Sequence, residues 1–230
     1  GTDFTSDGLG NASQASMDDI TTNGGAVVVK TGGTLTTTVT TGDIVTTGAT
    51  GNPGAAGGEV FLNSGGAITL GGKITATGGA GAADTNAGGA GGVVTLVAAS
   101  GAITINDVID VGGGAGTGPS AANGGAGGTL QLKSTGGTIT QSAEIKGAGG
   151  AASAGGGTAG ADGKLKVESN DAVTLAHASN NFGTVVAKLT TASKAFKYND
   201  TNTLTVGQVG AFGTDFTSDG LGNASQASMD

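Results

Sequence analysis

The segment GVVTLVAASGAITI, residues 92–105, decides the fold, because its apolar residues recur at alternate positions. Val94 and Leu96 lie two and four positions after Gly92, and Ile103 follows eleven positions after it. A period of two is typical of a β-strand that buries one of its faces. We therefore expect two short strands in this segment, separated by a turn.

The same arrangement occurs five times along the chain, at intervals of 33, 34, 36 and 35 residues. The copies begin at Gly25, Gly58, Gly92, Gly128 and Gly163. Equivalent positions hold Val27, Val60, Val94, Leu130 and Leu165, then Val29, Leu62, Leu96, Leu132 and Val167, then Leu35, Ile68, Ile103, Ile139 and Val173. A third strand is expected at Ile44, Ile74, Ile109 and Ile145, with Phe182 or Val185 in the fifth copy.

Strands this short are compatible with antiparallel hairpins or with parallel stacking of one copy on the next. The repeat favours stacking, because it places similar aliphatic side chains above one another in continuous columns. No segment has the apolar period of a long helix. The sequence therefore predicts an all-β fold, a parallel β-helix or β-solenoid with three short strands per coil.

A longer repeat encloses these copies. The first eighteen residues, GTDFTSDGLGNASQASMD, recur unchanged as residues 213–230, which gives a period of 213 − 1 = 212 residues. We expect residues 1–230 to form a single β-solenoid unit of about six coils, followed by the first residues of the next unit. Because strand sequence resumes at Asp19-Ile20, we interpret the repeated stretch as a loop that links units rather than as a cap.

Four copies carry a further segment of a dozen or more residues, rich in Gly and Ala, after their third strand. Both prolines, Pro53 and Pro119, lie in these segments, and no such segment follows Gly163. One interpretation is a set of flexible loops at one corner of the coil. The other is that extended, polyproline-like segments stack on one another, because glycine lets backbones approach closely enough to hydrogen-bond.

Three segments resemble the β-strand repeats of filamentous-haemagglutinin-type bacterial exoproteins and of giant bacterial repeat adhesins. They are GGEVFLNSGGAITLGGKITATGGAG (57–81), SNNFGTVVAKLTT (179–191) and YNDTNTLTVGQVG (198–210). The resemblance covers nearly the whole chain. It implies a right-handed parallel β-helix that is secreted and displayed at the bacterial cell surface as a long fibre or adhesin.

Composition argues against several classes of function. Excluding the repeated Asp215, Asp219 and Asp230, each unit has 17 − 3 = 14 acidic residues against 9 lysines and no arginine, a net charge of −5. Such a surface is a poor partner for nucleic acid. The chain has no cysteine for a disulfide or thiolate site. It has no run of eighteen apolar residues, so we expect no membrane span.

Few residues are candidates for chemistry, and we predict that the protein is not an enzyme. His177 is the only histidine, and no acidic residue lies at a suggestive spacing from it. Asp107 and Asp110 form the best carboxylate pair for the acid and base roles of glycoside cleavage. The basic cluster that β-helix glycan-cleaving enzymes place beside such acids is missing. We therefore predict no catalytic and no cofactor-binding residue.

Two sets of residues suit further ligands, one calcium and the other ice. Oxygen-rich turns that suit calcium occur at Asp18-Asp19, Asn106-Asp107, Asn170-Asp171 and Asn199-Asp200. The same pairs are ordinary turn residues, so we predict no metal site and keep calcium as an alternative. The threonine-rich run 34–50 suits an ice-binding face, but no Thr-x-Thr file continues through the other copies. Threonine there is expected simply to suit exposed strand positions.

A coil of this kind buries too few aliphatic side chains to be stable alone, so stability depends on stacking with its neighbours. We therefore expect a structural tandem-repeat unit of a long extracellular or cell-surface fibre, built by end-to-end stacking of coils. Its expected partners are neighbouring repeat units, with lateral bundling of fibres as a further option. The alternative is an adhesin repeat that binds glycan or another cell surface, which the scarcity of aromatic residues disfavours.

Overall fold

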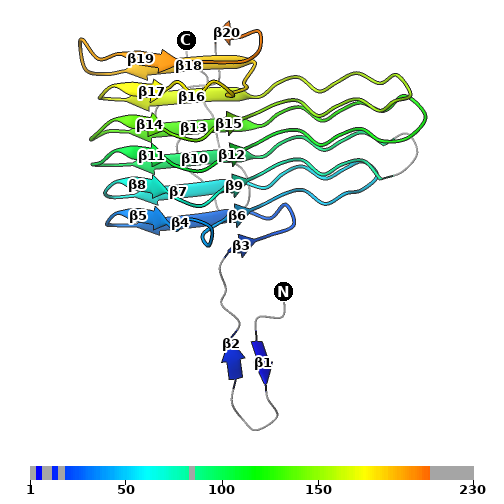
Figure 1. The fold of residues 1–230 in the computed structure, drawn as a ribbon, viewed down its shortest axis with the longest axis horizontal. Coiled ribbons are helices and arrows are strands. Elements are labelled where there is room, and N and C mark those ends of the chain that lie inside the picture. The colour runs from blue at the N-terminus through cyan, green and yellow to red at the C-terminus, as the bar shows by residue number, and fades with distance from the viewer. Residues whose placement is uncertain (1–3, 7–11, 15–18, 83–85, 208–230) are drawn as a thin grey trace.

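The computed structural model describes residues 4–6, 12–14, 19–82 and 86–207, and every regular element in these ranges is a β-strand. Three parallel sheets form the walls of a solenoid, and each complete turn adds one strand to every sheet (Figure 1). The predicted fold class, a parallel β-helix with three short strands per coil, is confirmed. Apart from the solenoid, β1 (Phe4–Ser6) and β2 (Ala12–Gln14) pair with each other in antiparallel fashion.

The three sheets differ in strand length. Sheet 1 contains β4 (Val27–Thr31), β7 (Val60–Ser64), β10 (Val93–Ala98), β13 (Thr129–Ser134), β16 (Lys164–Ser169), β18 (Thr184–Leu189) and β20 (Thr205–Val206). Sheet 2 contains β5 (Leu35–Thr37), β8 (Ile68–Leu70), β11 (Ile103–Ile105), β14 (Ile139–Gln141), β17 (Val173–Leu175) and β19 (Phe196–Tyr198). Sheet 3 contains β3 (Ile20–Thr21), β6 (Ile44–Val45), β9 (Ile74–Thr75), β12 (Ile109–Asp110) and β15 (Ile145–Lys146).

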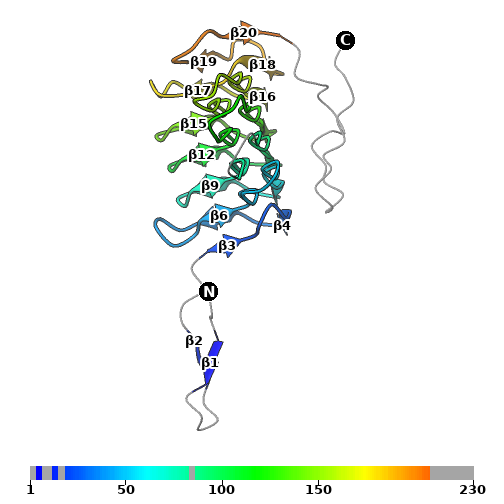
Figure 2. The ribbon, with the colours of Figure 1, turned by 90° about the vertical axis from the view of Figure 1, so that its right-hand side faces the viewer.

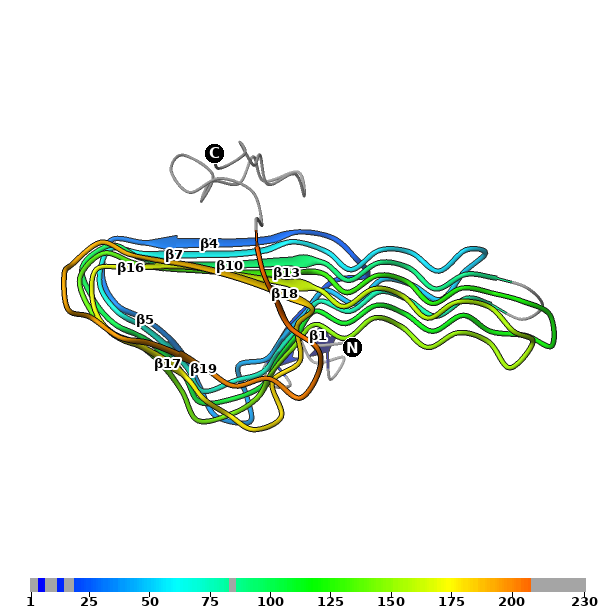
Figure 3. The same cartoon turned by 90° about the horizontal axis from the view of Figure 1, so that it is seen from above.

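The handedness is visible when the solenoid is viewed along its axis from the C-terminal end (Figure 3). The chain passes from sheet 1 through sheet 2 and sheet 3 anticlockwise while it rises toward the viewer, so the helix is right-handed. Figure 2 shows the same stack from the side, with the turns following one another along a single axis.

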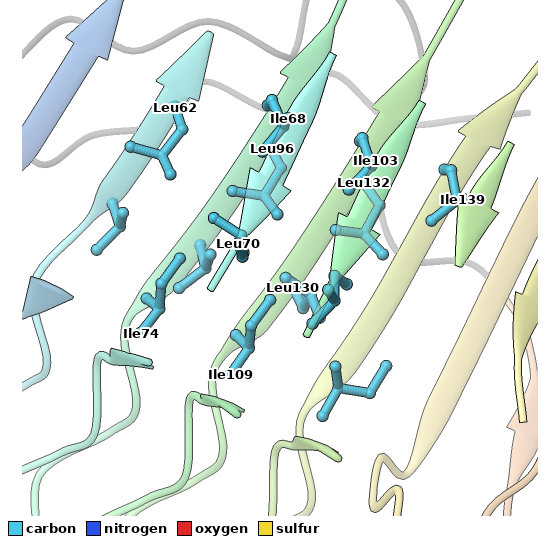
Figure 4. Close-up of a cluster of buried hydrophobic side chains, with 14 of the residues drawn as sticks. Leu62, Ile68, Leu70, Ile74, Leu96, Ile103, Ile109, Leu130, Leu132 and Ile139 are labelled. Carbon is cyan, nitrogen blue, oxygen red and sulfur yellow. The ribbon is translucent and has the colours of Figure 1, made fainter. Parts of the chain in front are cut away.

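The predicted aliphatic columns form the core. The strand register places Val94 between Val60 and Leu130, and it places Ile103 between Ile68 and Ile139. These side chains are fully buried. Figure 4 shows Ile68, Ile103 and Ile139 of the second column one beside the next inside the solenoid. Burial of one such side chain is worth about 1.5–3 kcal/mol. The columns therefore hold each turn to the turns above and below it.

Burial of one face only does not hold in the middle of sheet 1. Four outward-facing residues at equivalent positions, Phe61, Thr95, Gln131 and Lys166, are also almost completely buried. They stand in register one above another in the middle of the sheet. The prediction of strands with a single buried face is therefore wrong at this position.

The turns beyond Gly163 are shorter than predicted. Four turns have all three strands and are followed by a Gly-rich segment. The next two levels, β16 with β17 and β18 with β19, have no strand in sheet 3 and no such segment. Because Lys164 pairs with Thr184, that turn has 184 − 164 = 20 residues. The prediction of six coils of about 35 residues is therefore wrong for the last two levels.

The fifth member of the sheet 3 column was also predicted wrongly. Val185 pairs with Leu165 and continues the first column of sheet 1. Phe182 is buried, but it lies above Gly147, beyond the end of β15. The place above Ile145 is taken by Asn180, whose Oδ1 accepts a hydrogen bond of 3.1 Å from the Ile145 N–H. A polar cap thus replaces the expected aliphatic residue.

The Gly-rich segments leave the same corner of successive turns and project side by side away from the body (Figures 1 and 3). We call them arm 1 (residues 48–58), arm 2 (78–92), arm 3 (113–128) and arm 4 (149–163), and together the slab. Residues 83–85 lie outside the described ranges, as do residues 213–230, the second copy of the opening stretch.

Candidate functional surfaces

The single histidine has only a local role in the structure. His177 follows β17 and is partly exposed, and its Nδ1 accepts a hydrogen bond of 3.2 Å from the Ser179 N–H. A bond between residues two positions apart is the ordinary chemistry of a turn. The structure therefore places His177 in a surface turn.

Asp107 and Asp110 are used separately. Asp107 Oδ1 accepts a bond of 2.7 Å from the Val108 N–H, and Asp110 Oδ1 accepts one of 2.9 Å from the Gly112 N–H. Asp110 also lies 3.7 Å from Lys146 Nζ, which forms a closer ion pair of 3.0 Å with Glu144. The hydrogen bond to Glu144 raises the pKa of Lys146, and Asp110 adds to this effect. The contact between Asp110 and Lys146 joins two adjacent turns, and the other contacts are local.

The oxygen-rich turns use their side chains to bond groups of the adjacent turn. Asp19 Oδ1 accepts from the Asp43 N–H at 3.0 Å, and Asn199 Nδ2 donates to the Ala176 carbonyl at 3.0 Å. Asn106 Oδ1 accepts from the Ser142 hydroxyl, and Asn170 Nδ2 donates to the Thr135 carbonyl. Asp18 lies outside the described residues.

Asp171 is held by both a backbone group and a lysine. Its Oδ1 accepts from the Ala172 N–H at 2.6 Å and lies 2.7 Å from Lys194 Nζ. The hydrogen bond to Lys194, followed by the one from Ala172, lowers the pKa of Asp171. Across the part of the chain that the structure describes, no group of three or more His, Cys, Asp or Glu residues lies close enough together to hold a metal ion. Calcium binding therefore stays an untested alternative.

Threonine forms one continuous file on the outer face of sheet 2. Thr36, Thr69, Thr104, Thr140 and Thr174 pair in register over five levels. Sheet 2 strands have three residues, and their first and third positions turn inward, so only one threonine per level faces outward. The file is single, in agreement with the expectation that no Thr-x-Thr face continues through the copies.

The arms are ordered by backbone hydrogen bonds, which supports the stacking interpretation over that of flexible loops. In arm 1 the N–H groups of Gly51, Gly54 and Gly57 donate to carbonyls of arm 2 at 2.9–3.1 Å, and the Gly48 N–H donates to Thr77, immediately before arm 2, at 2.9 Å. Arms 2 and 3 repeat this pattern with their own next neighbour. The donors recur every third residue, which is the repeat of a polyproline II helix.

The two legs of each arm are also joined to each other and to the preceding arm. In arm 3 the Gly125 N–H donates to the Gly114 carbonyl at 2.8 Å, and the Gly114 N–H donates back to Gly89 of arm 2 at 2.8 Å. The slab is therefore a two-layered lattice of backbones. Its stability comes from hydrogen bonds rather than from apolar side chains.

The lattice requires glycine because neighbouring backbones leave no space for a Cβ atom. A Cβ added to Gly89 or Gly125 would lie far closer than 3.0 Å to a carbonyl oxygen of the preceding arm, a distance that real Cβ atoms do not reach. The third residue of each repeat faces solvent and carries a side chain, as at the exposed Ala90 and Ala126. The sequence signal is the GGx repeat, which composition alone did not reveal.

The first turn of the solenoid leaves its core open. A pocket of about 280 Å³ is lined mainly by apolar side chains, among them Ile20, Val29, Leu35, Ile44 and Leu62. The adjoining strands β4 and β5 are the last members of their sheets on this side. This end therefore presents an apolar core and unpaired strand edges.

At the opposite end, polar side chains finish the stack. Asn180 is fully buried and bonds Gln141, the Ile145 N–H and the Leu175 carbonyl. Asp200 Oδ2 accepts from the Phe182 N–H at 2.9 Å and from the Tyr198 hydroxyl at 2.5 Å. Burial, together with Asp200, raises the pKa of Tyr198. The edge strand β20 continues sheet 1 there, with Val206 83% exposed.

Aromatic side chains offer little surface for a ligand. Phe61 and Phe182 are buried, and Phe196 and Tyr198 are partly buried and stack on each other with ring centroids 6.5 Å apart. The described ranges contain no helix long and apolar enough to cross a membrane. Comparisons of the chain with protein-family models, with curated proteins and with solved structures each give no match.

Proposed function

We propose that this chain is a structural repeat unit of a long extracellular or cell-surface fibre, in which solenoid units follow one another end to end. The observation that carries the proposal is the open apolar core of the first turn, on a body whose levels repeat in register. At the first turn, the apolar pocket and the free edges of β4 and β5 are surfaces that another solenoid level would cover. Unpaired strand edges favour such association.

The sequence supports the same arrangement. The exact repetition of residues 1–18 as 213–230 supports covalent succession of units. The extracellular location rests on the resemblance to exported bacterial β-strand repeats.

An adhesin role stays the alternative. Glycan binding commonly uses exposed aromatic faces. Phe61, Phe182, Phe196 and Tyr198 are buried or partly buried, so none of these four side chains favours a glycan site. The structural role is therefore the function that the geometry supports best.

The experiment is to measure particle length in chains that carry one, two or three copies of the 212-residue period. The seven strands of sheet 1 at ~4.8 Å each correspond to about 34 Å, so each copy should lengthen the particle by about 34 Å while its cross-section stays constant. Small-angle scattering and electron microscopy give both quantities. Particles whose units hinge freely, so that length does not rise in proportion to copy number, would contradict the proposal. Glycan binding by the same chains would favour the adhesin alternative.

A further inference from the structure

The residue type at each slab position follows from what its Cβ would meet. At one position the Cβ would meet a carbonyl oxygen of the other leg of the same arm. This contact exists in every arm, and the position is glycine in every arm: Gly48, Gly78, Gly113 and Gly149.

Two other positions face the preceding arm. A Cβ on Gly79 would meet the Ala49 oxygen, and a Cβ on Gly89 would meet the Ala55 oxygen. The equivalents in arms 3 and 4 are again glycine, namely Gly114, Gly125, Gly150 and Gly160. Within the described residues no arm precedes arm 1, and there the two positions hold Ala49 and Ala55, both exposed.

Two further positions face the next level. They are glycine in the inner arms and carry side chains in the last arm. A Cβ on Gly88 or Gly124 would meet an oxygen of the following arm, and a Cβ on Gly91 or Gly127 would meet backbone of the following turn. The Gly124 N–H donates to Thr158 and the Gly127 N–H donates to Ala161, which aligns these two glycines with Ala159 and Asp162 of arm 4. The last arm thus carries side chains where the inner arms carry none.

Asp162 also supplies an acceptor that the next turn supplies in the inner arms. There the Gly78 and Gly113 N–H groups donate at 2.9 Å to the Gly112 and Ala148 carbonyls, which lie immediately before the next arm. In arm 4 the equivalent Gly149 N–H donates instead to Asp162 Oδ1 at 2.9 Å. Asn202 Nδ2 donates to the other carboxylate oxygen at 3.1 Å and holds the group in place.

We propose that Ala49 and Ala55 at one edge, and Ala159 and Asp162 at the other, close the slab against the arm of a second molecule. An incoming arm would have to bring its carbonyl oxygens to the distance that these side chains occupy. The occupant excluded is a second copy of this chain, whose arm would otherwise extend the lattice. This exclusion of a second molecule follows from the contacts of the arms and does not involve the solenoid ends.

The arms project beyond the body, so the arm of another molecule is able to reach these edges (Figure 3). Within one chain the levels β16–β17 and β18–β19 separate arm 4 from whatever follows, by roughly 10 Å at the usual strand spacing. In the proposed fibre, on which this step rests, the closed edges would therefore face the arms of neighbouring fibres. They keep fibres from cross-linking through a lattice that each of them already contains.

The test uses two variants of the 230-residue chain. A49G/A55G opens the first edge, and A159G/D162G opens the last edge. Extending the lattice requires an open first edge on one molecule and an open last edge on the other. Sedimentation velocity should therefore show a 1:1 complex when the two variants are mixed, with an apparent Kd about tenfold or more below that of either variant alone.

Matched controls separate edge closure from a general loss of side chains. A56G/A90G and A126G/A161G remove the same number of side chains from exposed arm positions and should behave as the wild type when mixed. D162N keeps the acceptor for the Gly149 N–H but removes the charge, and it should leave the edge closed. Association through the solenoid ends, the basis of the proposed fibre, occurs equally in all these proteins and is subtracted as the wild-type background.

Circular dichroism and hydrogen exchange of the arm amides show whether each variant keeps the slab. If both edge variants retain protected arms and the mixture still sediments as the wild type does, the proposal is wrong. If an edge variant loses arm protection, the four side chains are needed to form the slab rather than to bound it, which also overturns the proposal.

Discussion

In the solenoid body one level rests on the next through aliphatic side chains, whereas in the arms it rests on bare backbone. Leu96 in the body and Gly125 in the arms are both buried, but Leu96 fills space and Gly125 leaves it empty. Successive levels therefore pack at the same spacing in both regions, through large side chains in the body and through the absence of side chains in the arms. Each region should respond in the opposite sense to a change in side-chain size.

The largest effect is expected for Leu96→Ala in the body. Leu96 is fully buried in the middle of its column, so truncation should lower the free energy of unfolding by about 2–5 kcal/mol. Urea unfolding measures this loss, and Val39→Ala, at a residue 68% exposed, should change it by less than about 0.5 kcal/mol. Because the arms are anchored in the body, their amides should lose exchange protection together with the strands. Arms that stayed protected would show that the slab is independent of the body.

The opposite substitution tests the arms. Gly125→Ala forces a methyl group against the Gly89 carbonyl, and such overpacking should cost about 1–3 kcal/mol. Gly32→Ala is the matched control, because nothing lies within 4 Å of the added Cβ. Its effect should be neutral or slightly stabilising, since alanine restricts the unfolded chain. Equal unfolding free energies for the two variants would mean that the backbones of the slab are not in close contact.

A smaller effect is expected where the stack ends without arms, at Tyr198. Tyr198→Phe removes the bond to Asp200, at a cost of about 0.5–1.5 kcal/mol near neutral pH. Because the pKa of Tyr198 is raised in the folded protein, this part of the stability is present below the unfolded value of 10.0 and is lost as pH rises above it. The wild type should therefore lose more stability than Tyr198→Phe between about pH 9 and about pH 11. Parallel pH profiles would contradict this assignment.

The smallest effect is expected for the exposed pair Asp171 and Lys194. Lys194 lowers the pKa of Asp171 in the folded protein, so the stability it provides is present above 3.8 and is lost as pH falls through the lowered value. Lys194→Gln should flatten the fall in melting temperature between about pH 5 and about pH 2. Lys188→Gln makes the same charge change on β18 and should leave that fall unchanged.

The body was largely predictable from the sequence, because each buried position repeats with its own residue type. Val60, Val94 and Leu130 stack as their spacing indicated. The end of sheet 3 was not predictable, because Asn180 is placed above Ile145 by its side-chain hydrogen bonds and not by hydrophobicity. Val185 satisfied the same apolar pattern and was assigned to the wrong column.

The arms lay at the limit of sequence reasoning. A composition rich in glycine and alanine fits a flexible loop as well as it fits a packed lattice. Only the position of each alanine distinguishes the two interpretations. Ala126 faces solvent in an inner arm, whereas Ala49 marks an edge. The candidate surfaces therefore needed the register between arms, which the sequence does not state.

The way in which the slab is held has a consequence for its heat capacity. Unfolding raises heat capacity through exposed apolar surface and lowers it through exposed polar surface. The arms bury mostly peptide groups. Their unfolding should therefore add enthalpy but raise the heat capacity less than the unfolding of an apolar core does. Hydrophobic cores weaken on cooling, but backbone lattices of this kind do not depend on that force. The contribution of the arms to stability should therefore fall less on cooling than the contribution of the apolar core.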